Sequence, residues 1–207
     1  MRRTKEEAFQ TRSDLLDAAE VLFWERGVAR TTLEEIARAA GTTRGAIYHH
    51  FENKHDLLLT LLDRRLLPHD DDLAKIEADQ TADPIVGLRA SSRTILERLA
   101  DDPSQRRVAG ILLQRCEPID DMTETLDIHR RTILRSRERV VRLFERADAR
   151  GQLAAPWTPR SAAVSLHALI TGLIYGWLRA PDDLDLRRDG FACLDAFFAG
   201  IVRRHEA

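Results

Sequence analysis

The sequence predicts an all-α protein, and three of its features agree on this. Apolar residues recur three and four positions apart in almost every segment, and no segment alternates as a half-buried strand does. Helix start and stop residues, such as Asp83-Pro84 and Gly151, punctuate the pattern. With 207 residues and 43% hydrophobic content, the chain can build a substantial core. We expect about nine helices, in an N-terminal three-helix domain with a helix-turn-helix and a larger C-terminal helical domain.

The helix-turn-helix is predicted from a close run of helix boundary signals. Thr32 is a good N-cap, and Glu35 three residues later completes a capping box for the first helix of the pair. Gly41 follows that helix at a position where a left-handed backbone favours glycine. Thr42 or Thr43 then caps the second helix. Two short helices joined by a tight turn are therefore expected between residues 32 and 51.

The remaining helices are placed by apolar periodicity and by capping residues. Asn53 is expected to cap a helix that ends at Pro68, and the acidic stretch 69–72 is expected to bend or start a turn. Pro84 occupies the first position of the next helix, where its missing N–H costs nothing. The other expected helices span residues 11–26, 84–100, 104–116, 120–150, 159–178 and 190–203.

The outward face of the second helix of the pair has residue types that suit a nucleic-acid duplex. Arg44 can fork onto a guanine edge, and Tyr48 can reach a phosphate through its hydroxyl. Lys54, just beyond the helix, adds a charge for the phosphate backbone. An ordinary helical hairpin with threonine caps would show part of this pattern. The expected DNA-contacting residues are Thr32, Thr42, Thr43, Arg44, Gly45, Tyr48, His49 and Lys54.

The charge balance limits the size of such a DNA-binding surface. The chain has 32 Lys and Arg against 34 Asp and Glu, a formal net charge of −2, which argues against nucleic-acid binding over the whole surface. Cations gather instead in the tail, as Arg2, Arg3 and Lys5, and from Arg38 to Lys54. A small basic footprint makes few phosphate contacts per subunit, so tight binding would need a dimer.

The same residues carry a family resemblance. The run from Gly41 to Lys54, Gly-Thr-Thr-Arg-Gly-Ala-Ile-Tyr-His-His-Phe-Glu-Asn-Lys, resembles the signature of the TetR family of bacterial repressors. The opening residues 2–8 and the segment 30–33 resemble the branch that represses multidrug efflux pump operons. His49 departs from that branch, which usually has Trp or another aromatic residue there. This departure bears on the operator sequence and not on the DNA-binding role.

The resemblance implies a division of labour along the chain. Residues 1–55 would form the helix-turn-helix DNA-binding domain with its basic tail, and residues 56–207 the helical effector-binding and dimerisation domain. The implied protein is a cytoplasmic repressor, without enzymatic activity or a cofactor, that binds a palindromic operator as a homodimer. A small hydrophobic or amphiphilic effector would release it from a multidrug efflux operon. The alternative is a regulator of a metabolic or lipid-related operon with another effector.

Small residues spaced by four in the last two helices indicate a dimer interface. Glycine inside a helix costs about 1 kcal/mol relative to alanine, so repeated glycines suggest a packing reason. Packing within one chain would also account for such a stripe. The family uses this region as a four-helix interface, which the resemblance carries over to residues 160–203. The expected interface residues are Ala168, Gly172, Gly176, Ala192, Ala196 and Gly200.

Three polar residues beside that stripe, His167, Thr171 and Tyr175, suggest an effector site. A cluster of core residues that satisfy one another is the alternative, and the resemblance favours a pocket. Thr171 stands where some relatives have an acid, so we expect neutral or anionic amphiphiles more than cationic drugs. An apolar lining with a few polar points is usual for small-molecule sites. The expected lining residues are Leu66, Leu88, Ser91, Ser92, Ile95, Ala109, Leu112, Leu113, Ile133, Ser136, Val140, His167, Ile170, Thr171, Ile174 and Tyr175.

Other functions are less well supported by the sequence. An enzyme would need a phosphate loop, a nucleophile elbow or triad spacing, and none is found. Metal binding by His49, His50 and His55 would be hindered because adjacent helical residues point about 100° apart. Cys116 and Cys193 are expected to be buried free thiols. The apolar run 162–178 contains a histidine and falls short of a membrane span, so we expect a buried helix and no membrane partner.

Overall fold

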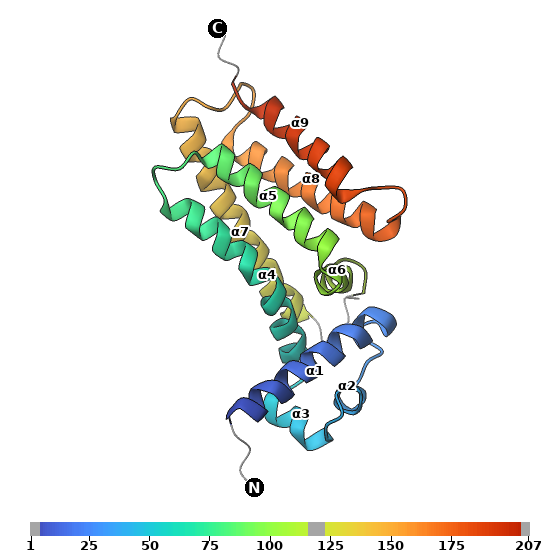
Figure 1. Cartoon of the computed structure of the whole chain (residues 1–207). Coiled ribbons are helices and arrows are strands. Elements are labelled where there is room, and N and C mark those ends of the chain that lie inside the picture. The colour runs from blue at the N-terminus through green and yellow to red at the C-terminus, as the bar shows by residue number, and fades with distance from the viewer. Residues whose placement is uncertain (1–4, 116–122, 204–207) are drawn as a thin grey trace. The chain divides into compact units, whose positions relative to one another are not determined.

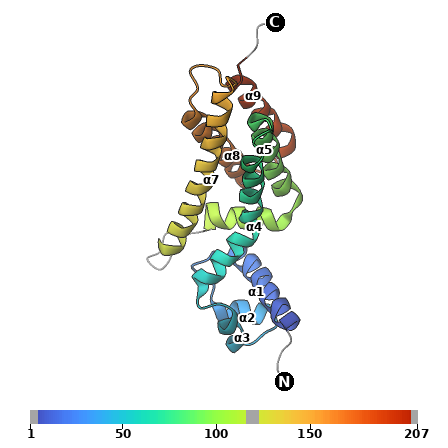
Figure 2. The same ribbon diagram turned by 90° about the vertical axis from the view of Figure 1, so that its left-hand side faces the viewer.

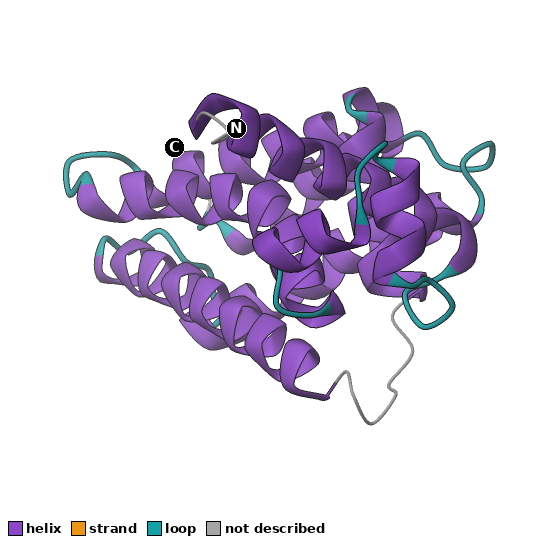
Figure 3. Cartoon of the chain, turned by 90° about the horizontal axis from the view of Figure 1, so that it is seen from below, coloured by secondary structure: helices purple, strands orange, loops and turns teal. Residues whose placement is uncertain are grey.

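The structure, a computed structural model, describes residues 5–115 and 123–203, with the backbone alone at 65–69, 115 and 123–133. Arg2, Arg3, Cys116 and the expected helix start at 120–121 lie outside the described residues, as do the side chains of Leu66 and Ile133. The described chain is helical, and Figure 3 shows only helices and loops. One isolated antiparallel bridge joins Leu153 to Val202. The helices are α1 (Lys5–Arg26), α2 (Leu33–Ala39), α3 (Arg44–His50), α4 (Lys54–Ala78), α5 (Pro84–Asp101), α6 (Pro103–Gly110), α7 (Thr123–Ala149), α8 (Pro159–Arg179) and α9 (Phe191–Ile201), with π-helical stretches η1 (Ile111–Arg115) and η3 (Leu186–Gly190).

The chain forms two compact units that do not follow chain order. The first contains the described residues up to Leu66 together with those of 104–129, and the second contains 67–103 and the described residues from Arg130 onward. The helix α6 and the stretch η1 therefore pack with the N-terminal helices, although they follow α5 in the sequence. The predicted boundary between a DNA-binding domain (1–55) and an effector-binding and dimerisation domain (56–207) divides the chain by function, and it stays a prediction.

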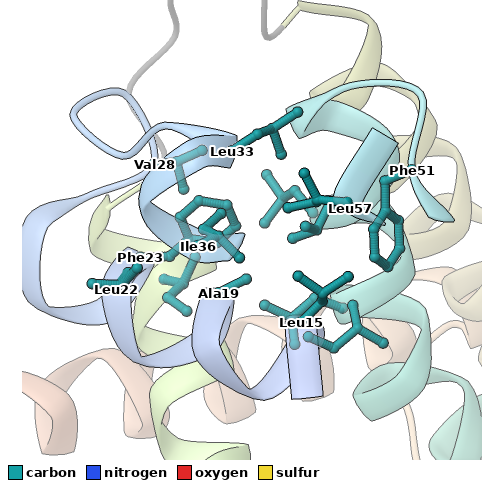
Figure 4. Packing of buried hydrophobic residues seen from close by; sticks show 14 of the residues in the cluster. Leu15, Ala19, Leu22, Phe23, Val28, Leu33, Ile36, Phe51 and Leu57 are labelled. Atoms are coloured by element: carbon teal, nitrogen blue, oxygen red, sulfur yellow. The ribbon is translucent and has the colours of Figure 1, made fainter. Parts of the chain in front are cut away.

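The first unit is built around one apolar cluster, shown in Figure 4. Each of its helices buries an apolar face, and removing a side chain such as Phe23 from water contributes about 1.5–3 kcal/mol. Ile47 is the one fully buried residue of α3, which leaves the rest of that short helix available to solvent or a partner. The cluster is formed by Leu15, Leu16, Ala19, Leu22, Phe23, Val28, Leu33, Ile36, Ala37, Ile47, Phe51, Leu57, Leu58, Leu61, Leu62, Val108 and Ile111.

The helix boundaries of the helix-turn-helix agree with the sequence signals. The N–H of Glu35 donates to the Thr32 hydroxyl at 3.2 Å, and the N–H of Thr32 donates to the Glu35 carboxylate at 2.9 Å. The Thr32 N–H and the Thr32 hydroxyl both donate to the Glu35 carboxylate, and these two bonds hold the pKa of Glu35 below its usual value. Gly41 has φ +66°, the left-handed conformation expected after α2. Of the two threonines considered for the next cap, it is Thr43 that accepts from the Ala46 N–H, at 3.2 Å.

The predicted end of α4 at Pro68 and the bend after it are wrong, because the helix continues to Ala78. Contacts made by its second half favour the helical backbone over the local break. Leu73 is fully buried, and Asp72 accepts from Arg98 of α5 at 3.0 Å. Glu77 pairs with Arg139 of α7 at 2.7 Å, while the guanidinium of Arg146 donates to backbone carbonyls near the helix end. The predicted Asn53 cap is confirmed, since its side chain accepts from the Asp56 N–H at 2.9 Å.

In the second unit, α5, α8 and α9 lie side by side in both Figure 1 and Figure 2. The helices α5 and α9 are joined by Asp195, which accepts from Arg89 at 3.0 Å and from Arg93 at 3.1 Å. The Arg93 guanidinium also lies 4.2 Å from the centre of the Phe191 ring. Ion pairing and apolar burial together fix α9 against α5, which positions the outer faces of α8 and α9 described below.

Candidate nucleic-acid interface and effector region

The short helix α3 presents a polar face to the surroundings of the first unit. Thr43, Arg44, Gly45, Tyr48 and His49 are exposed, whereas Ile47 on the opposite face is buried. The predicted outward orientation is therefore confirmed for these residues, whereas Thr42, expected on the same face, is half-buried. The large aromatic side chain of Tyr48 is 46% exposed and therefore accessible to a partner. Thr32 and Thr43, both expected to contact DNA, already use their hydroxyls to cap α2 and α3.

A carboxylate that the sequence analysis did not single out lies against this face. Oε1 of Glu34, in the first turn of α2, is 3.0 Å from Nε of Arg44. The Tyr48 hydroxyl donates to the same oxygen at 3.3 Å. The Arg44 guanidinium in turn lies 5.8 Å from the centre of the Tyr48 ring. One acidic side chain thus joins the two residues of α3 best suited to DNA, and only the tertiary fold brings residues 34, 44 and 48 together.

Lys54, expected to contact a phosphate, makes structural contacts in the single chain. Its Nζ donates to the backbone carbonyls of Val28 at 2.8 Å, Thr31 at 3.0 Å and Ala29 at 3.3 Å. These contacts hold the 28–31 loop between α1 and α2 against the start of α4. A phosphate contact by Lys54 stays a prediction.

A buried ion pair joins α6 to α1 within the first unit. Glu20 of α1 is 2% exposed, and its carboxylate lies 2.6 Å from a terminal nitrogen of Arg107 and accepts from Arg107 Nε at 2.7 Å. The Ser104 hydroxyl donates to the other carboxylate oxygen. Beside this pair, Gly110 packs so closely that an added Cβ would lie 2.1 Å from the Trp24 ring. The helix α6 is therefore fixed to the DNA-binding helices by both charge and shape.

The residues expected to line an effector pocket are divided between the two units. Leu66, Ala109, Leu112 and Leu113 belong to the first unit, and the other expected residues belong to the second. Within the second unit, Ser91 and Ser92 are buried in α5, and the Ser92 hydroxyl donates to the Leu88 carbonyl of its own helix at 2.7 Å. A buried hydroxyl satisfied in this way needs no ligand. The assignment of these residues to a pocket stays a prediction.

His167 and Tyr175, both on α8, are exposed in the single chain. Partial burial lowers the pKa of His167, and the positive charge of Arg137 on α7 acts in the same direction. Both effects favour the neutral imidazole, in which one ring nitrogen donates a hydrogen bond and the other accepts one. The Tyr175 hydroxyl accepts from Arg179 at 3.4 Å. Thr171, between them in the sequence, is half-buried.

The small residues expected at a dimer interface form exposed faces on α8 and α9. Ala168, Gly172, Ala192, Ala196 and Gly200 are exposed, and Gly176 is half-buried. A Cβ added at any of the three glycines would meet nothing within 4 Å, so packing within the chain does not explain them. Cys193, expected to be buried, is exposed on the same side of α9, and that prediction is wrong for the single chain.

The fold and this surface define a helix-turn-helix DNA-binding protein, and comparisons with known proteins extend the definition. Residues 15–61 match the family of bacterial regulatory proteins of the tetR type, and residues 83–201 match the C-terminal region of MAATS-type transcriptional repressors. The transcriptional regulator TtgR of Pseudomonas putida is 41% identical over 189 residues, covering 91% of this chain and 90% of its own.

Solved structures give the same result. NalD, the secondary repressor of the MexAB-OprM multidrug efflux pump in Pseudomonas aeruginosa, superposes with a TM-score of 0.86 at 38% identity, covering 95% of this chain and 98% of its own. SmeT, the repressor of the Stenotrophomonas maltophilia pump SmeDEF, does so in its triclosan complex with a TM-score of 0.85 at 38% identity, covering 93% and 92%. The chain belongs to the TetR family of bacterial regulatory proteins.

Family membership accounts for the apolar character of α8. This helix is long and apolar enough by composition to cross a membrane, and no other helix in residues 5–115 and 123–203 passes that test. Its buried side packs in the second unit through residues such as Leu166 and Trp177, and its outer side carries the small residues of the expected interface. A TetR-family regulator binds operator DNA as a dimer, and burial in a dimer would remove that outer face from water.

Proposed function

We propose that this protein is a cytoplasmic transcriptional repressor that controls a multidrug efflux operon. A small hydrophobic effector releases it from its operator. The observation that carries the proposal is the exposed face of α3, with Arg44 and Tyr48 presented outward from a rigid core. Efflux control is supported by NalD and SmeT, whose similarity extends over more than nine-tenths of the chain. The same relatives favour an efflux operon over a metabolic or lipid-related one.

Two copies of α3 in a dimer would read the two halves of a palindromic operator. A two-fold axis in the protein matches the two-fold axis of such a sequence, and each copy contributes few phosphate contacts on its own. The exposed small-residue faces of α8 and α9 supply the surface for this dimer. Gly172→Leu places a bulky side chain in that face, and we expect it to abolish the dimer and operator binding together. Sedimentation that shows an intact dimer would refute the interface.

Release by an effector follows from thermodynamic linkage. An effector that binds better to a conformer unable to fit successive major grooves weakens DNA binding, and by reciprocity DNA weakens effector binding by the same factor. We place the effector near His167, whose neutral imidazole suits a neutral or anionic amphiphile. His167→Ala should weaken induction while leaving operator affinity unchanged. A variant induced as readily as the parent would remove His167 from the effector site.

The experiment that tests the proposal is footprinting on the DNA immediately upstream of the protein's own gene, with and without triclosan. We expect protection of an inverted repeat, lost when triclosan is added, and a rise in the melting temperature of the free protein with the same compound. If triclosan and other hydrophobic drugs left the protection unchanged, the DNA-binding part of the proposal would stand and control of an efflux operon would be rejected. Absence of any protected sequence would reject the proposal as a whole.

A further inference from the structure

The carboxylate of Glu34 takes no part in the capping box of α2. In the first turn of this helix the neighbouring Glu35 forms the capping box with Thr32. Its side chain reaches instead to α3, where Oε1 contacts both Arg44 and Tyr48. A single oxygen that serves two DNA-facing residues on another helix indicates a role in how those residues are presented.

The geometry of the Arg44 contact is selective. The nitrogen nearest Glu34 is Nε, at 3.0 Å, whereas a bidentate contact with guanine O6 and N7 uses the two terminal nitrogens of the guanidinium. The pair can therefore persist while Arg44 reads a base. The Tyr48 ring beside the guanidinium and the Tyr48 hydroxyl on the same oxygen further restrict the arginine. Less rotamer freedom is then lost when Arg44 binds DNA.

We propose that Glu34 is a specificity-determining residue of the operator-binding face, acting as a buttress that positions Arg44 for a guanine edge. This inference rests on the proposed function, because it requires operator DNA as the ligand. The carboxylate also disfavours simple phosphate contact, since it cancels the charge of Arg44 and repels nearby phosphates. Glu34 thus strengthens binding at the matching base pair and weakens binding to unrelated DNA, and both effects raise the ratio of the two affinities.

The buttress is exposed, which sets the size of the expected effect. The Arg44 side chain is 73% exposed and that of Glu34 37%, and exposed ion pairs contribute little to stability. Replacement of Glu34 should therefore leave the fold intact and act on DNA recognition. Glu34→Gln keeps the size of the side chain and its helix propensity and removes the charge. Glu52→Gln is a matched control, because Glu52 is an exposed acid of the same unit outside α2 and α3.

The experiment compares dissociation constants for two duplexes at several salt concentrations: the upstream fragment protected by the parent protein, and a scrambled duplex of the same composition. We expect Glu34→Gln to lower the ratio of the two affinities about three- to tenfold, and to relax base preference at the operator position that Arg44→Ala also relaxes. In the Arg44→Ala background, Glu34→Gln should change base preference no further. Melting temperatures of all variants confirm that they fold.

Three results would overturn the inference. Glu34→Gln could change both affinities by the same factor as Glu52→Gln, which would reduce its effect to net charge. It could relax a different position from Arg44→Ala, which would make Glu34 a direct reader of a base. It could also act equally with and without Arg44, which would exclude coupling between the two side chains. Failure of the parent protein to select the upstream fragment over the scrambled duplex would instead reject the proposed function.

Discussion

Two glutamate–arginine pairs in the first unit have the same chemistry and opposite environments. Glu20 and Arg107 join α1 to α6, and the carboxylate is 2% exposed. Glu34 and Arg44 join α2 to α3, and both side chains face solvent. Breaking the Glu20–Arg107 pair leaves a partly buried charge without its partner, whereas an exposed pair exchanges its partner for water at little cost. The first pair therefore holds the fold together, and the second is available to a ligand.

The largest effect is expected from the buried pair. Glu20→Gln leaves Arg107 without its counter-charge, and we expect the free energy of unfolding to fall by about 2–3 kcal/mol, less than for a fully buried pair because Arg107 is one-third exposed. Urea denaturation followed by circular dichroism measures this loss. Glu34→Gln is the control, with an expected change below about 1 kcal/mol. Equal losses of unfolding free energy in the two variants would show that the Glu20–Arg107 pair is no more important for stability than the Glu34–Arg44 pair.

The close approach of α6 to α1 beside the buried pair offers a second test. Gly110→Val adds a side chain where a Cβ alone would lie 2.1 Å from the Trp24 ring, so the helices must separate. Overpacking of this kind costs about 1–3 kcal/mol. Gly45→Ala is the matched control, since the nearest heavy atom to its Cβ, in Thr43, is 4.0 Å away and alanine favours the helix. A melting temperature unchanged by Gly110→Val would contradict the described packing.

The loop held by Lys54 should give an intermediate effect. Lys54→Met keeps the length of the side chain but removes three hydrogen bonds to carbonyls between α1 and α2, and we expect a loss of about 1–2 kcal/mol. Arg30→Met removes an exposed charge from the same loop and should change stability by less than about 0.5 kcal/mol. The denaturation midpoints of the two variants show whether Lys54 stabilises the fold. If the Lys54→Met protein were as stable as the parent but bound all duplexes more weakly, Lys54 would be a phosphate contact.

The smallest effect is expected from Tyr48 at the exposed pair. Tyr48→Phe removes the hydroxyl that donates to Glu34 and keeps the ring beside Arg44. We expect stability within about 0.5 kcal/mol of the parent and a two- to threefold weaker operator affinity, since about one exposed hydrogen bond is lost. Gel-shift titration on the protected fragment provides the measurement. A loss larger than that of Arg44→Ala would make Tyr48, and not Arg44, the principal contact.

The parts of the fold that depend on local signals could be predicted from the sequence. The capping box of Thr32 and Glu35, the left-handed Gly41 and the outward face of α3 depend on residues within one helical turn of each other. The continuation of α4 beyond Pro68 could not be predicted, because it depends on the burial of Leu73 and on the pairing of Glu77 with Arg139 of α7, which is far away in the sequence.

The same division applies to the candidate site. Arg44 and Tyr48 could be chosen by type and spacing, but Glu34 is ten residues before Arg44 and meets it only through the crossing of α2 and α3. The carbonyl contacts of Lys54 could not be predicted, because the sequence does not show whether a lysine beyond a recognition helix lies near phosphates or near carbonyls. Which residues these side chains contact depends on how the helices cross, and the periodicity of the sequence does not show that.

The central claim is that the exposed face of α3 reads operator DNA in two copies, and selection from randomised duplexes tests it most directly. At low ionic strength the parent protein should enrich an inverted repeat, with one position per half-site whose base preference disappears in Arg44→Ala. Enrichment of no inverted sequence, or of the same sequence by the parent and by Arg44→Ala, would contradict the claim.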